Sequence, residues 1–163
     1  MARAELILGG ARSGKTAHAL AGAEAAAAAR VYVATAQAWD DEMAERIARH
    51  KAERGTGWRT VEAPLDLPGA LAGTGADEAV LIDCLTLWLS NLMGAGRDIE
   101  AETAALLLAV ADCPAPVFLV SNEVGLGLVP ETPLGREFRD RQGRLNQQMA
   151  AAAERVTFVA AGL

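Results

Sequence analysis

The chain has 163 residues, of which 52% are hydrophobic, and its formal net charge is −6. This apolar content excludes a disordered chain, and the length suits one domain with one hydrophobic core. The negative charge argues against a nucleic-acid-binding protein, which needs a basic surface to displace counterions from phosphates. No apolar stretch approaches the roughly 20 residues of a membrane span. The longest candidate, Ala79–Met93, is interrupted by Asp83 and Asn91.

The expected location is cytoplasmic. The apolar run before the first glycines is too short for a signal peptide. Cys84 and Cys113 form neither a disulfide framework nor a metal-ligand spacing, and we interpret them as small buried hydrophobic residues. An acidic chain must hold anionic ligands through local positive features. Lys15 and Lys51 are the only lysines, and the first of them lies in a glycine-rich segment.

Short apolar runs alternate with helical stretches, which predicts a parallel sheet covered by helices. Each expected strand is a continuous run of small and branched apolar residues, typical of strands buried on both faces. The expected strands are Glu5–Leu8, Val31–Thr35, Ala79–Asp83, Val117–Ser121 and Val156–Ala160, with a weaker one at Trp58–Glu62. The expected helices are Lys15–Ala29, Asp40–Arg54, Leu65–Ala72, Thr86–Met93, Ile99–Ala111 and Leu134–Ala153.

A phosphate-binding loop follows the first strand. Its glycines allow a tight turn that points backbone amides at phosphate oxygens, and the next helix adds the positive end of its dipole. Lys15 is expected to reach the terminal phosphates, and the Thr16 hydroxyl to ligate Mg²⁺. The segment has the G-x-x-x-x-G-K-T spacing and reads Gly9-Gly10-Ala11-Arg12-Ser13-Gly14-Lys15-Thr16. We therefore predict an α/β fold of the P-loop NTPase type: three layers, a mainly parallel central sheet flanked by helices, and a single catalytic domain over residues 1–163.

Asp83 closes the apolar run Val80–Ile82 and is a second candidate for the metal site. A carboxylate at the end of a neighbouring strand can hold Mg²⁺ together with Thr16, or contact the nucleotide. The alternative interpretation is a simple N-cap for the helix over Leu85–Met93.

The segment Asp40–Lys51 begins with acidic residues and ends with basic ones, which matches a helix dipole. Met43, Ile47, His50 and Arg54 share one helical face. A histidine there can be a partly buried structural residue. Neighbouring cations would instead favour a neutral imidazole that acts as a nucleophile, and would attract a polyphosphate.

These motifs together resemble the bifunctional adenosylcobinamide kinase/adenosylcobinamide-phosphate guanylyltransferase family, over nearly the whole chain. Besides the phosphate loop, the resemblance is carried by Tyr32–Thr35, Asp41–Met43, Arg46-Ile47, His50-Lys51, Trp58–Thr60, Glu62, Asp83–Thr86, Asn91-Leu92, Ser121–Pro130, Arg136–Asp140, Gly143-Arg144 and Asn146-Gln147.

The resemblance implies two reactions. Adenosylcobinamide is phosphorylated with ATP or GTP, and GMP is then transferred from GTP to adenosylcobinamide phosphate, releasing pyrophosphate and giving adenosylcobinamide-GDP. It also implies a homo-oligomer and a GMP-histidine intermediate on His50, with Lys15 as the other catalytic residue. The GTP contacts that it implies are Gly9, Gly10, Ala11, Arg12, Ser13, Gly14, Lys15, Thr16, Ala34, Thr35, Ala36, Lys51, Ala52, Glu53, Arg54, Glu62 and Asp83.

Several interpretations stay open. Asn122–Gly125 is either a glycine-containing connection or a substrate or γ-phosphate contact. Arg136, Asp140, Gly143 and Gln147 share a helix face that could meet the corrinoid, a neighbouring subunit or solvent. The rival functions are a plain P-loop kinase with a structural His50, and a non-catalytic nucleotide switch, against which the acidic charge and the lack of an aromatic or basic DNA-binding tract count.

Overall fold

The computed structural model describes residues 3–163, without the side chains of Arg46, His50 and Glu53. Six strands form one sheet in the order β3-β2-β4-β5-β1-β6, and every neighbouring pair is parallel. The strands are β1 (Ala4–Gly9), β2 (Ala29–Ala34), β3 (Trp58–Glu62), β4 (Glu78–Asp83), β5 (Val117–Asn122) and β6 (Arg155–Val159). The helices are α1 (Lys15–Ala26), α2 (Asp41–Glu53), α3 (Leu67–Ala72), α4 (Leu85–Gly94), α5 (Ile99–Asp112) and α6 (Pro133–Ala152).

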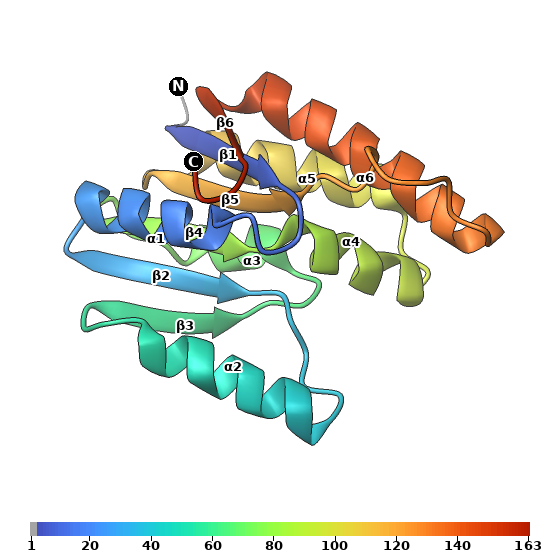
Figure 1. Cartoon of the computed structure of the whole chain (residues 1–163). Helices are drawn as coiled ribbons and strands as arrows, with labels where there is room; N and C mark the ends of the chain where they lie inside the picture. The colour runs from blue at the N-terminus through green and yellow to red at the C-terminus, as the bar shows by residue number, and fades with distance from the viewer. Residues whose placement is uncertain (1–2) are drawn as a thin grey trace.

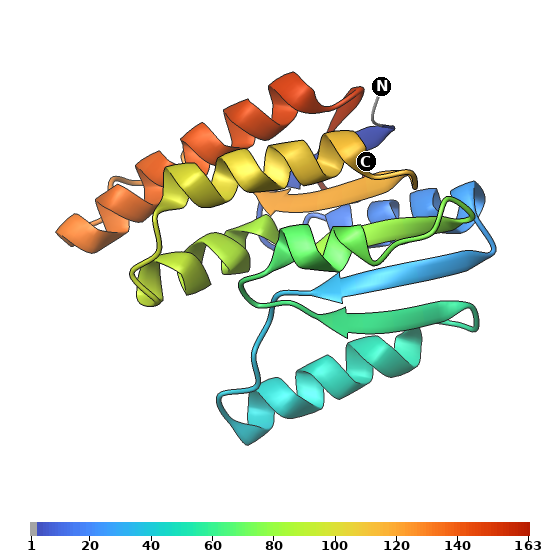
Figure 2. The same cartoon turned by 180° about the vertical axis from the view of Figure 1, so that it is seen from behind.

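Two cores lie on opposite faces of the sheet (Figures 1 and 2). On one face Ile7, Leu81 and Phe118 pack against α1. On the other face alternate residues of the same strands, such as Leu6 and Ile82, pack against α3, α4, α5 and α6. This alternation buries both faces of the strands and explains their continuous apolar runs. The predicted three-layer α/β architecture is confirmed.

Small residues let α1 approach the sheet closely. Ala19 and Ala23 are fully buried, and a Cβ added at Gly22 would meet the Phe118 ring at 2.7 Å. A larger side chain at Gly22 would push the helix outward, because this interface leaves no space for it. The alanine-rich composition of the first helix therefore sets the distance between the sheet and the N-terminus of α1.

Helix α2 lies beyond the edge strand β3 and covers neither face of the sheet (Figure 1). Its first turn is capped by Asp40, whose side chain accepts a hydrogen bond from the Met43 amide. Of its described side chains, only those of Met43 and Ile47 are half-buried, and the rest are exposed. This helix is therefore held by few contacts.

Two predicted helix boundaries are wrong. Alanine has the highest helix propensity, so the alanine run predicted a first helix through Ala29. The helix ends at Ala26, because Ala27 is extended and Ala29 already pairs with Glu78 in the sheet. The predicted start at Leu65 is also wrong, since the Asp66 side chain caps the helix through the Gly69 amide. In both places the tertiary structure or a capping bond overrides the local pattern.

The remaining boundaries differ from the prediction by at most two residues, and the weaker strand Trp58–Glu62 is confirmed with the same bounds. Among the described helices, none combines the length and the apolar character needed to cross a bilayer.

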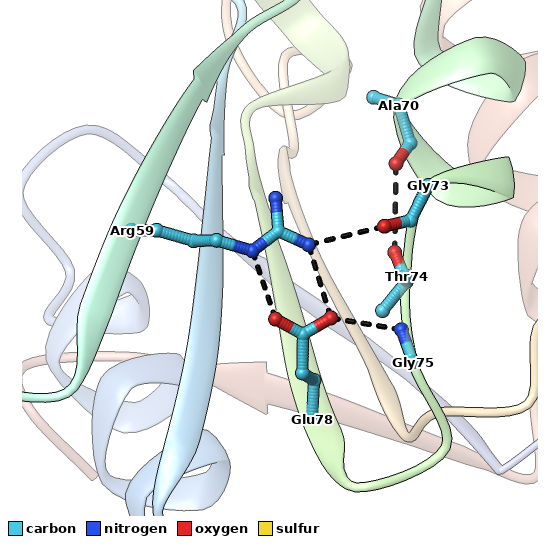
Figure 3. Close-up of polar contacts among 6 residues, drawn as sticks. All are labelled: Arg59, Ala70, Gly73, Thr74, Gly75 and Glu78. Carbon is cyan, nitrogen blue, oxygen red and sulfur yellow. Dashed lines mark hydrogen bonds and ion pairs between the residues drawn. The ribbon is translucent and has the colours of Figure 1, made fainter.

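A bidentate ion pair between Arg59 and Glu78 connects β3 to the start of β4 across β2. It lies at the edge of the sheet where the strands begin (Figure 3). Arg59 Nε lies 2.8 Å from Glu78 Oε1, and its Nη2 lies 3.0 Å from Oε2. The Gly75 amide donates to the same carboxylate at 2.8 Å. These bonds, chiefly the one from Arg59, lower the pKa of Glu78, and the bond to Glu78 raises the pKa of Arg59.

We expect Glu78→Gln to lower the free energy of unfolding by about 1 kcal/mol at neutral pH, since Arg59 is partly solvated. The melting temperature should fall by about 2–4 °C. The pKa of Glu78 is lowered in the folded state, so its contribution is present above the unfolded pKa and is lost as pH falls through the folded pKa. Urea titrations between pH 3 and 7 measure this. Glu137→Gln, which breaks the more exposed i,i+4 pair with Arg141, is the control with a smaller effect. Equal losses in both variants at neutral pH would contradict the prediction.

Candidate active site

The phosphate loop connects β1 to α1 and is braced by the last residues of the chain. A Cβ added at Gly9 would meet the Val159 carbonyl oxygen at 2.5 Å. Gly14 has φ +98°, and a Cβ there would lie 3.1 Å from the Cα of Gly162. The Gly162 amide also donates to the Ser13 carbonyl at 2.8 Å. Close approach and a left-handed backbone therefore explain the glycines at both ends of the loop.

Two polar side chains of the loop are buried. Lys15 is 8% exposed, and its Nζ donates to the Gly10 carbonyl at 2.7 Å. Burial lowers the pKa of Lys15, while the neighbouring Cys84 and Asp83 raise it. The Ser13 Oγ is also buried and has no hydrogen-bond partner within the described part of the chain. Buried groups with spare hydrogen-bonding capacity, beside backbone amides at a helix N-terminus, are suited to an anion such as a phosphate.

The carboxylate of Asp83 faces the start of α1. Its Oδ2 accepts a hydrogen bond from the Tyr32 hydroxyl at 2.7 Å and from Thr16 Oγ1 at 3.4 Å. Burial, followed by the neighbouring Asp83, raises the pKa of Tyr32, so its hydroxyl stays a donor. The simple N-cap interpretation of Asp83 is wrong, because the N-cap of α4 is Cys84, whose Sγ accepts from the Leu87 amide.

A cavity of about 730 Å³ opens beside the loop at the edge where the strands end. Met43 and Ile47, which lie on one face of α2, also line it. The structure describes the backbone of His50 and Glu53, which are both part of α2. Their side chains lie outside the described part of the structure. The lining residues are Ala11, Arg12, Ser13, Gly14, Lys15, Thr16, Ala17, Ala36, Met43, Ile47, Asp83, Cys84, Leu87 and Asn122.

The segment after β2 combines a cavity-lining residue with a structural one. Ala36 lines the cavity, whereas Thr35 is fully buried. Thr35 Oγ1 donates to the Cys84 carbonyl and accepts from the Cys84 amide, both at 2.8 Å. Asn91 Nδ2 donates to the Thr35 carbonyl at 2.9 Å. The Thr35 side chain therefore connects the end of β2 to Cys84, the residue after Asp83. Any contact of Ala34 and Thr35 with a nucleotide stays a prediction.

The remaining predicted nucleotide contacts lie outside the cavity lining. Lys51 and Ala52 are exposed on α2, and Glu62 is exposed at the end of β3. The Arg54 guanidinium lies 3.6 Å from the centroid of the Tyr32 ring, and its Nη2 donates to Thr60 at 3.1 Å. The structure thus brings Ala11–Thr16, Ala36 and Asp83 together at one cavity. The described residues Lys51, Ala52, Arg54 and Glu62 are not part of its lining.

A buried polar network beside β5 was missed by the sequence interpretation. Gln142 Nε2 donates to Ser121 Oγ and to Asn146 Oδ1, each at 2.9 Å, and Asn146 Nδ2 donates to the Asn122 carbonyl at 3.1 Å. This network supports Asn122, which lines the cavity. The i,i+4 spacing of Gln142 and Asn146 beside a strand ending in Ser121 was the available signal.

The helix face interpreted as a corrinoid or subunit contact lies next to this network. Arg136, Asp140 and Gln147 are exposed, and Gly143 is half-buried. Arg136 donates to the carbonyls of Pro130 and Glu131 at 2.9 and 2.8 Å. What the exposed side chains contact stays a prediction.

The fold and site define a P-loop α/β nucleotide-binding protein: a parallel sheet, a glycine loop before a helix, a buried lysine and an acid on another strand. The family model of cobinamide kinase / cobinamide phosphate guanyltransferase matches residues 5–163. The chain therefore belongs to this family of enzymes of cobalamin biosynthesis.

Three curated relatives cover nearly the whole chain. The bifunctional adenosylcobalamin biosynthesis protein CobP of Pseudomonas aeruginosa is 48% identical, over 98% of this chain and 94% of its own length. The bifunctional adenosylcobalamin biosynthesis protein CobU of Escherichia coli is 44% identical, over 97% and 96%. The protein of the same name from Salmonella typhimurium is 43% identical, over 97% and 96%.

We expect Gly14→Ala to destabilise the protein by about 1–2 kcal/mol, because a left-handed backbone costs an L-residue about that much. The new Cβ would also press on Gly162. Gly10→Ala is the matched control, since no atom lies within 4 Å of a Cβ at that position and its φ is not positive. It should unfold at the same or slightly higher urea concentration than the wild type. Equal destabilisation by the two changes would show that the loop backbone is not constrained as described.

Proposed function

We propose that the chain, as one catalytic domain, phosphorylates adenosylcobinamide with ATP or GTP and then transfers GMP from GTP to adenosylcobinamide phosphate. The products of the second reaction are adenosylcobinamide-GDP and pyrophosphate. Membership of the family and the names of the three relatives support this proposal. The observation that carries it in the structure is the convergence of Lys15, Thr16 and Asp83 on one cavity. We place the enzyme in the cytoplasm, where both nucleotides are available, and expect it to act as a homo-oligomer.

In the kinase reaction the protein mainly positions groups and offsets charge, since phosphoryl transfer requires little covalent help. The loop amides and the Lys15 ammonium bind the β- and γ-phosphates. Lys15 exchanges its bond to the Gly10 carbonyl for bonds to the nucleotide. The substrate hydroxyl oxygen forms a bond to the γ-phosphorus and loses its proton to water, while the bond to the bridging oxygen breaks and the nucleoside diphosphate leaves.

In the guanylyl transfer a neutral imidazole nitrogen of His50 attacks the α-phosphorus of GTP, and the bond to pyrophosphate breaks. A phosphate oxygen of adenosylcobinamide phosphate then attacks the same phosphorus, and the phosphorus–nitrogen bond breaks to restore His50. The role of His50 rests on the family resemblance and on its helical spacing from Met43 and Ile47, which line the cavity. Lys15 and the loop amides stabilise the charge on the leaving pyrophosphate.

The residues beside the loop fit a nucleotide-bound Mg²⁺. The Thr16 hydroxyl and the Asp83 carboxylate are oxygen donors, which Mg²⁺ prefers, and they already lie 3.4 Å apart. The described side chains contain no group of three His, Cys, Asp or Glu that could hold a metal ion. Two protein ligands completed by phosphates and waters are the usual arrangement for this ion. When bound, Mg²⁺ neutralises charge on the phosphate oxygens.

We expect α-labelled GTP to label the wild-type protein through a bond that is labile in acid and stable in base, as a phosphoramidate is. His50→Ala should lose the label and the guanylyl transfer while it keeps the kinase reaction, because the kinase reaction needs no covalent intermediate. Lys15→Met should lose both reactions by at least a hundredfold. Product analysis by mass spectrometry measures both.

His18→Gln is the matched control. His18 is the only other histidine, and it lies on the outer side of α1 beside Glu5, 3.1 Å from its carboxylate. This variant should be labelled as the wild type is. Labelling that persists in His50→Ala, or guanylyl transfer without any labelled protein, would contradict the histidine intermediate. The remaining explanations would be a plain P-loop kinase or a different transfer route.

A further inference from the structure

Tyr32 connects the two parts of the site that carry different chemistry. It lies on β2 and pairs with Leu81 of β4. Leu81 precedes Asp83 by two residues on the same strand. The Tyr32 hydroxyl reaches forward along the sheet and donates to Asp83 Oδ2 at 2.7 Å. Thr16 donates to the same oxygen, and no described residue donates to Oδ1. The two donors thus orient the carboxylate and leave Oδ1 without a donor among the described residues.

The ring of Tyr32 contacts a different element. The guanidinium carbon of Arg54 lies 3.6 Å from the ring centroid, a distance at which a cation–π attraction is strong. Trp58 packs edge-on against the same ring, with centroids 6.2 Å apart. Arg54 is the C-cap residue that directly follows α2, the helix to which His50 belongs. Tyr32 is only 8% exposed, so its ring is held in place by the surrounding residues and offers the guanidinium a fixed contact.

This contact is important because α2 has little else to hold it. No described residue of α2 belongs to either hydrophobic core, and the helix lies outside the two helical layers (Figure 1). At the C-terminal end of the helix, Arg54 contacts the Tyr32 ring and donates to Thr60 Oγ1 at 3.1 Å. The orientation of α2 therefore depends strongly on the position of the Arg54 guanidinium against the Tyr32 ring.

We propose that Tyr32 is a positioning residue that couples these two parts of the site. Its hydroxyl orients the Asp83 carboxylate toward the nucleotide-bound metal, and its ring seats Arg54 and thereby the helix that bears His50. The inference rests on the metal site and the histidine intermediate of the proposed function. The hydroxyl acts on metal affinity, whereas the ring acts on the histidine transfer alone, so the two contributions can be measured separately.

Tyr32→Phe tests the hydroxyl, because it retains the ring and its packing on Arg54 and Trp58. We expect the complex of the protein with a non-hydrolysable GTP analogue to bind Mn²⁺ about tenfold more weakly, as loss of a ligand-orienting hydrogen bond commonly does. Electron paramagnetic resonance of free Mn²⁺ measures this without turnover. Labelling by α-labelled GTP at saturating Mg²⁺ should stay near the wild-type rate. An affinity within twofold of the wild type would overturn the role of the hydroxyl.

Tyr32→Leu removes the ring as well. It should bind Mn²⁺ as weakly as Tyr32→Phe, but its labelling should remain at least tenfold slower at saturating Mg²⁺. Equal labelling of the two variants would overturn the role of the ring. If circular dichroism shows that the leucine variant is unfolded, Arg54→Met replaces it. We expect this variant to lose more labelling than Mn²⁺ affinity. Equal losses of the two would contradict the proposal.

Trp58→Phe is the control for general disturbance of this cluster. It keeps an aromatic ring against Tyr32, while it removes the N–H bond to Glu24 and part of the ring surface that faces Arg30. Both its Mn²⁺ affinity and its labelling should equal those of the wild type, and parallel losses in this variant would reduce Tyr32 to a packing role. Failure of the proposed function looks different: the wild type would not be labelled, while the Mn²⁺ comparison would still test the hydroxyl.

Discussion

The site depends on the contact of one carboxylate oxygen with two hydroxyl groups. Asp83 Oδ2 accepts hydrogen bonds from Tyr32 on β2 and from Thr16 at the start of α1. Asp83, Tyr32 and Thr16 are distant in the sequence and meet because the strands are parallel and end at one edge. The carboxylate is half-buried, and these donors offset the cost of desolvating it.

The packing of α1 makes this contact possible. The helix lies close to the sheet because Ala19, Gly22 and Ala23 face it. On the other side of the loop, Val159 and Gly162 press on Gly9 and Gly14 and fix the turn that precedes Lys15. Lys15, which follows this turn, is buried, and this burial lowers its pKa.

The enzyme has two reactions, and its elements differ in how firmly they are held. The phosphate loop is fixed by its close contacts with Val159 and Gly162, and Asp83 is fixed by its bonds to Tyr32 and Thr16. The described side chains of helix α2 are mostly exposed, and Arg54 at its C-terminal end contacts Tyr32 and Thr60. Weakly packed elements are the ones that move at low cost. Such a helix suits the role that we propose for His50, whose imidazole would reach the α-phosphorus and then meet the second substrate.

The sequence by itself determined the phosphate loop, the element order and the acid at the end of β4, because each depends on local spacing and on apolar periodicity. It also determined the family, through motifs spread over the whole chain. Only the tertiary structure decided the end of α1 at Ala26, the structural role of Thr35, and the network of Ser121, Gln142 and Asn146. It alone placed Tyr32 between Asp83 and Arg54. These features arise from contacts between residues far apart in the chain, and neither propensity nor periodicity encodes which distant groups will meet.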